Sequence, residues 1–104
     1  MKISEWLINN TDSHVIQDHE KLAESFEKET GHKANWPHFT EKQTRAAIEA
    51  RGLGGELKGG CDKLCYGYNV AESLAWEHAQ FRSSKNGRGF RFRECIAALQ
   101  EKGL

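Results

Sequence analysis

The chain has 104 residues, and its fifteen basic and fifteen acidic side chains give a formal net charge of zero at pH 7. This length suits one domain, so we expect a single domain over residues 1–104 without room for a large enclosed active site. The neutral total also argues against a protein that coats nucleic acid through bulk charge alone.

The sequence also limits where the protein is expected to work. Residues 1–8 are too short and too charged for a signal peptide, and no apolar run approaches the roughly 20 residues that cross a bilayer. The three cysteines are an odd number, which fits poorly with a disulfide framework. We therefore expect a reduced, soluble protein of the cytoplasm with no membrane partner.

Charge is unevenly distributed along the chain. Residues 1–32 carry three lysines and seven acidic residues, a balance of −4, whereas residues 33–104 carry twelve basic and eight acidic residues, a balance of +4. A polyanionic partner is therefore expected to contact the second part of the chain. The densest basic segment, residues 81–93, has no acidic residue and five cations: Arg82, Lys85, Arg88, Arg91 and Arg93.

Two helices are predicted in the first third of the chain. Residues 3–9 can form a short helix with its apolar side chains on one side. A longer helical stripe follows, with Ser13 or Asp18 as its N-cap and Gly31 as its end. The residues of the two predicted stripes are, in order, Ile3, Trp6 and Leu7, then Val15, His19, Leu22 and Phe26.

A third helix is predicted from a capping box at Thr40 to Gln43, and it should run to about Arg51 with Gly52 beyond its end. One face would carry Thr44, Ala47, Ile48 and Arg51. The opposite face would carry Lys42, Arg45, Ala46 and Glu49.

A β-hairpin is predicted next. Residues 56–58 can form a short strand, and the alternation of Leu64, Tyr66, Tyr68 and Val70 indicates a half-buried second strand that pairs through the turn at 59–63. The expected fold class is therefore a small, mostly helical α+β domain. Its winged-helix-like core would span about 13–70, with a helical extension over about 71–104.

The predicted extension contains two helices. Asn69 is the expected cap of the first, whose stripe is Leu74, Ala75, His78 and Phe81. The stripe of the second is Phe92, Cys95, Ile96 and Leu99, and Gly103 is its expected end.

Three segments resemble the winged-helix modules found at the ends of phage and plasmid primases. Residues 21–31 are similar to their first helix, residues 40–53 to their recognition helix, and residues 66–70 to the strand that closes their wing. The resemblance covers about half of the chain. It implies binding to DNA by a regulator or accessory factor of a phage or mobile element.

Two groups of DNA-binding residues are expected in such a module. Lys42, Gln43 and Arg45 would meet base edges from the first half of the recognition helix. Lys58 and Lys63 are the only cations of the predicted wing, and Glu49 places an acid near the reading face. A solvated helix face, or a face that contacts a protein, is the alternative interpretation of residues 40–53.

The basic segment is open to two interpretations. Arg91 and Arg93 alternate with Phe90 and Phe92, so a strand would place cations on one side, for phosphates, and rings on the other, for bases. A helix would instead make Phe92 part of the core and leave a basic loop before it.

Chemistry beyond binding has little support in the sequence. Cys61, Cys65 and Cys95 could form a zinc site with a histidine, but a paired second motif is missing, and Cys95 lies on an apolar stripe. Neither a nucleophile motif nor a Walker loop occurs. We therefore expect a protein that is not an enzyme and needs neither metal nor cofactor.

The predicted function is DNA binding, with an alternative. The acidic first third, together with Trp6 and Trp36 as candidates for exposed aromatic residues, favours a protein-binding inhibitor or adaptor that targets a host nucleic-acid enzyme or defence complex. The sequence does not determine the oligomeric state.

Overall fold

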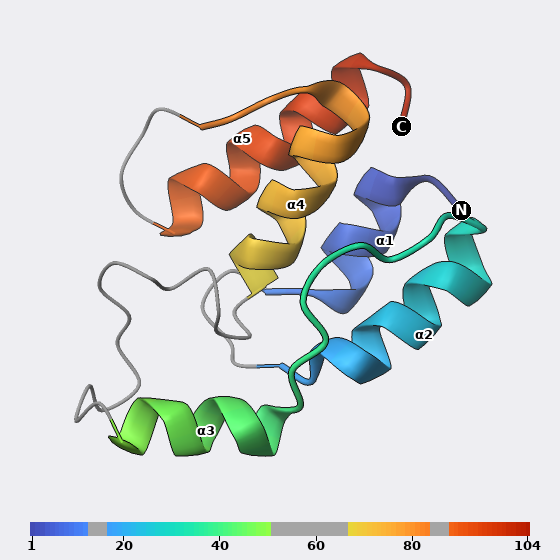
Figure 1. Cartoon of the computed structure of the whole chain (residues 1–104). Helices are drawn as coiled ribbons and strands as arrows, with labels where there is room; N and C mark the ends of the chain where they lie inside the picture. The colour runs from blue at the N-terminus through green and yellow to red at the C-terminus, as the bar shows by residue number, and fades with distance from the viewer. Residues whose placement is uncertain (13–16, 51–66, 84–87) are drawn as a thin grey trace.

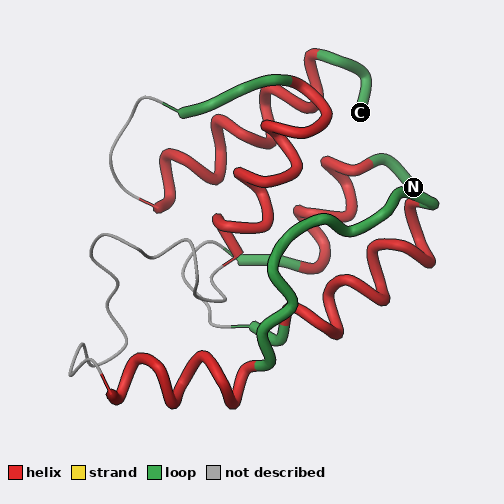
Figure 2. Tube along the Cα trace, in the orientation of Figure 1, coloured by secondary structure: helices red, strands yellow, loops and turns green. Residues whose placement is uncertain are grey.

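Helices make up all of the regular structure that can be described. The computed structural model describes residues 1–12, 17–50, 67–83 and 88–104, and in these ranges no residue lies in a strand (Figure 2). The helices, labelled in Figure 1, are α1 (Ile3–Asn10), α2 (His19–Thr30), α3 (Glu41–Ala50), α4 (Gly67–Ala79) and α5 (Arg88–Glu101).

Helix α1 confirms its sequence prediction, and α2 confirms the second one from His19 onward. Ser13 and Val15, which the sequence also assigned to the start of the second helix, lie outside the described residues. In α1 the predicted apolar side is buried at Ile3, Trp6 and Leu7. Helix α2 begins after Asp18, whose carboxylate accepts a hydrogen bond from the Lys21 amide at 3.1 Å, and it ends at Gly31, which has the left-handed φ of 77°.

Helix α3 begins with the predicted capping box. The Gln43 amide donates to Thr40 Oγ1 at 3.1 Å, and the Thr40 amide donates to Gln43 Oε1 at 3.0 Å. Two amides that the helix itself cannot pair are thereby satisfied. Thr44 is buried, whereas Lys42, Arg45, Ala46 and Glu49 are exposed, as predicted for the opposite face. The side chains of Ala47 and Ile48, and residues 51 and 52, lie outside the described part of the chain.

The predicted hairpin and the winged-helix fold are wrong. Residues 67–70, assigned from the sequence to its second strand, form the first turn of α4, and no strand occurs in the described residues. The remaining hairpin residues, 56–66, lie outside the described ranges. The fold class is therefore a small helical domain in place of an α+β winged helix.

The error has a physical cause in the burial of the first turn of α4. All of residues 67–71 are buried, so this first turn is covered on every side of the helix. Tyr68 and Val70 are therefore buried without belonging to a strand that has one buried face. A Cβ at Gly67 would lie 2.1 Å from the backbone oxygen of Asp12, so the turn fits against the chain after α1 only without a side chain. This long-range contact leaves no pattern in the local sequence.

Helix α5 confirms the helical interpretation of residues 92–99. Cys95 and Leu99 are fully buried, and Phe92 packs partly buried against the core. The helix ends at Gly103, with φ of 73°, where the Gly103 amide donates to Gln100 O at 3.0 Å and the Leu104 amide to Leu99 O at 2.9 Å. These two bonds form a Schellman motif.

Helix α1 connects the two sides of the core. It packs against α2 on one side and α5 on the other, while α4 packs along α5 (Figure 1). Helix α3 lies apart from α4 and α5 in the figure. The chain ends also meet, because the Ser4 amide donates to Leu104 O at 3.1 Å.

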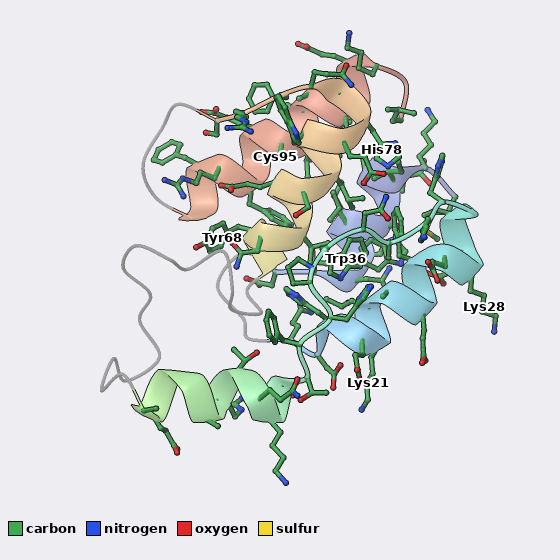
Figure 3. All side chains as sticks on the ribbon, in the orientation of Figure 1. Lys21, Lys28, Trp36, Tyr68, His78 and Cys95 are labelled. Atoms are coloured by element: carbon green, nitrogen blue, oxygen red, sulfur yellow. The ribbon has the colours of Figure 1, made fainter. Side chains whose placement is uncertain are left out.

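Three aromatic rings form the centre of the core. Trp6 of α1 lies 5.0 Å from Phe26 of α2, and Trp36, from the connector between α2 and α3, lies 5.1 Å from Phe26 and 6.0 Å from Trp6 (centroid distances). Trp6 is 0% and Trp36 3% exposed, and Figure 3 shows Trp36 in the interior. The expectation that these two tryptophans are exposed is therefore wrong.

The aromatic core gives a stability prediction with a matched control. Phe26→Ala should lower the free energy of unfolding by about 3–5 kcal/mol, because the ring is fully buried between two tryptophans. Phe90→Ala removes the same ring from a site that is 58% exposed, and the change should stay within about 0.5 kcal/mol. Urea unfolding measures both, and equal losses would contradict the packing described here.

Candidate functional site

On the expected reading face of α3, two of the predicted side chains have partners within the helix. Gln43 uses its side chain in the capping box. Arg45 pairs with Glu41 one turn earlier, at 2.7 Å from Nη2 and 2.9 Å from Nε. The surface hollow beside Lys42 is lined by three acids and two bases: Asp18, Glu41, Glu49, Lys42 and Arg45.

The two lysines of the predicted wing, Lys58 and Lys63, lie outside the described residues. The basic segment, residues 81–93, is described in part: Lys85 lies outside the described residues, and for Arg88 the structure gives the backbone, at the start of α5, without the side chain. Arg93 is exposed on α5. Because residues two apart on a helix point to different sides, Arg91 and Arg93 do not share a face, and the strand interpretation of residues 90–93 is wrong.

Arg82 and Arg91 do come together, at a hollow between α4 and α5. Its volume is about 370 Å³, the lower end of the range for ligand sites. Helix α4, the segment after it and α5 all contribute to the lining, which consists of Glu72, Ser73, Trp76, Phe81, Arg82, Ser83 and Arg91.

Helix α4 determines which side chains line this hollow. Leu74 and Ala75 are fully buried in the core. Glu72, Ser73 and Trp76 lie on the other side of the helix, where Trp76 is 49% exposed. The chain leaves α4 at Gln80, whose φ of 49° is left-handed, and this reversal carries Arg82 back over the helix.

The charged groups interact directly with Trp76 and with each other. The guanidinium carbon of Arg82 lies 4.2 Å from the Trp76 ring centroid, a cation–π contact. Arg91 Nη1 lies 3.6 Å from Glu72 Oε1. Burial raises the pKa of Glu72 above its usual 4.5, and Arg91 partly offsets this effect. The site thus combines an accessible ring, two guanidinium groups and one partly buried carboxylate.

Sequence reasoning identified the arginines of this site and missed Trp76 and Glu72. The sequence does contain an indication that Trp76 is exposed. Position 76 does not belong to the helical stripe formed by Leu74, Ala75 and His78. A large aromatic residue off the buried stripe of a helix is expected to be exposed, where its ring is available to a ligand.

The cysteines and histidines do not form a metal site in the described part of the chain, where no group of three metal-binding side chains occurs. Cys61 and Cys65 lie outside that part. Cys95 is buried in the apolar core. The predicted core position of His19 is confirmed, since the ring is 2% exposed and its Nδ1 donates to Pro37 O at 3.0 Å.

The position of Cys95 makes its thiol unreactive. Burial, together with the nearby carboxylates of Glu72 and Glu94, raises its pKa to about 12, so the thiolate is scarce at neutral pH. In a Cys61→Ser, Cys65→Ser variant, iodoacetamide at pH 8 should leave Cys95 unmodified in the native protein and modify it in guanidinium chloride. Mass spectrometry measures the extent of modification. Rapid modification of Cys95 in the native variant would contradict its burial.

Membrane insertion has no support from the described helices, since none is long and apolar enough to cross a bilayer. Comparison of the chain with models of known protein families, with curated proteins and with solved structures gives no match.

Proposed function

We propose that this protein is a non-catalytic binding module that holds single-stranded DNA on the surface between α4 and α5. The observation that carries the proposal is the half-exposed Trp76 ring with Arg82 at 4.2 Å above it. Proteins bind single strands by combining rings, on which bases stack, with cations that follow the phosphates.

The surroundings of Trp76 support this proposal. Arg91 lines the same hollow, and Phe90, one position before it on α5, is 58% exposed. A duplex keeps its bases stacked inside, whereas a single strand can offer a base face to Trp76. We therefore expect the protein to bind single strands more tightly than duplexes. The DNA would contact α4 and α5 in place of α3.

The setting of this activity is part of the proposal. A cytoplasmic location fits a binder of nucleic acid, and the free, buried thiol of Cys95 is compatible with reducing conditions. A role in a phage or mobile element stays a prediction from the sequence resemblance.

Binding to another protein is the second candidate function, and the α3 surface favours it. Its hollow mixes three acids with two bases, an arrangement that would repel a polyanion as much as attract it. An inhibitor or adaptor that contacts its target through α3 would use this mixed charge for specificity.

A direct binding measurement tests the first proposal. Anisotropy of a labelled mixed-sequence single strand should show binding at low salt that weakens steeply toward physiological salt. Trp76→Ala should weaken binding by roughly 5- to 150-fold, the range expected when one base loses its stacking partner. The absence of binding at low salt would refute the proposal and make a protein partner the working hypothesis.

Two arginines of the basic segment provide a matched comparison. Arg82→Ala removes the cation over Trp76, whereas Arg93→Ala removes the same charge from an exposed position that does not line the hollow. We expect a much larger loss of affinity for Arg82→Ala. Equal losses in the two variants would show that the segment acts only through overall charge.

A further inference from the structure

Glu72 is not explained by attraction to a polyanion. Among the described residues that line the hollow it is the only acid, and a carboxylate there repels phosphate. Its side chain is 39% exposed, and burial already disfavours its charged form. An ionised carboxylate only accepts hydrogen bonds, so a ligand that contacts Glu72 would have to present hydrogen-bond donors such as N–H groups.

The spacing of Glu72 and Trp76 brings this acceptor to the edge of a stacked base. The two residues are four positions apart on α4, so their side chains are neighbours on one face of the helix. A base that stacks on the ring of Trp76, or on the guanidinium plane of Arg82, extends sideways from its stacking partner. Its hydrogen-bonding edge can then reach a carboxylate one helical turn away.

Base chemistry distinguishes the ligands. Guanine presents two adjacent donors, N1–H and the N2 amino group, which match the two oxygens of one carboxylate. Adenine and cytosine present an amino donor next to a ring-nitrogen acceptor, and thymine presents one N–H between two carbonyl oxygens. In these three bases an acceptor would face the carboxylate and weaken the contact.

From this juxtaposition we infer that the hollow binds a guanine base, which stacks against the Trp76–Arg82 pair while Glu72 accepts from N1–H and the N2 amino group. Arg91 holds the carboxylate in place through its 3.6 Å contact, and its positive charge favours a ligand that carries a phosphate. The inference rests on the proposed function, because it specifies which base that surface selects.

Replacing guanine by inosine tests the inference without changing the protein, because inosine lacks only the N2 amino group. The probes are a labelled short oligothymidine with one central guanine and the same strand with inosine at that position. The wild-type protein should bind the guanine strand roughly tenfold more tightly, as expected for one good two-point contact. Glu72→Gln should reduce this ratio to below about twofold, because an amide offers one acceptor in place of two.

A charge-matched variant separates recognition from overall charge. Glu101→Gln removes the same charge from an exposed position at the end of α5, so it should keep the full preference for guanine. Glu72→Gln is expected to fold, because the raised pKa of Glu72 means that its ionised form lowers stability as the pH rises above 4.5.

The outcomes distinguish the two proposals. If the wild-type protein binds both strands equally, or if Glu72→Gln keeps the preference, the guanine inference fails while single-strand binding stands. If neither strand binds at low salt, the proposed function itself fails.

Discussion

The contact among Trp6, Phe26 and Trp36 is the constraint on which the rest of the structure depends. These rings come from α1, α2 and the connector after α2, and their polar atoms are also satisfied, since Trp6 Nε1 donates to Ser25 Oγ and Trp36 Nε1 to His19 O. With few apolar residues available, three large rings supply much of the buried area. They fix α2 and the connector against α1, and α1 in turn provides the surface on which α5 packs.

Helix α5 packs on α1, and α4 packs on α5. The packing of α4 against α5 also determines which side chains line the hollow. The small side chains of Ala71 and Ala75 are buried in the core from α4. The side chains of Cys95 and Leu99 are buried there from α5. Once these residues are inside, Trp76 and Glu72 must lie on the outer side of α4. The site is therefore held by rigid helices, which suits a ligand whose orientation has to be fixed.

Local chemistry could be predicted from the sequence, and long-range packing could not. The helix ends could be predicted because each depends on backbone groups only a few residues away. Examples are the cap at Asp18, the capping box of Thr40 and Gln43, and the end of α5 at Gly103. Residues 67–70 were assigned to a strand because alternating burial and complete burial look alike in a short segment. Likewise the sequence shows that Arg82 and Arg91 are basic, but it does not show that they lie beside Trp76. That arrangement depends on how α4 packs against α5.

The different environments of the tryptophans have a spectroscopic consequence. Of the three in the chain, Trp6 and Trp36 are sealed in the core, while Trp76 is 49% exposed beside a guanidinium group. Their emission therefore divides into a blue component from the interior and a red, quencher-accessible component from the hollow. The molecule carries two intrinsic optical probes, one for the integrity of its core and one for occupancy of its surface, without any attached dye.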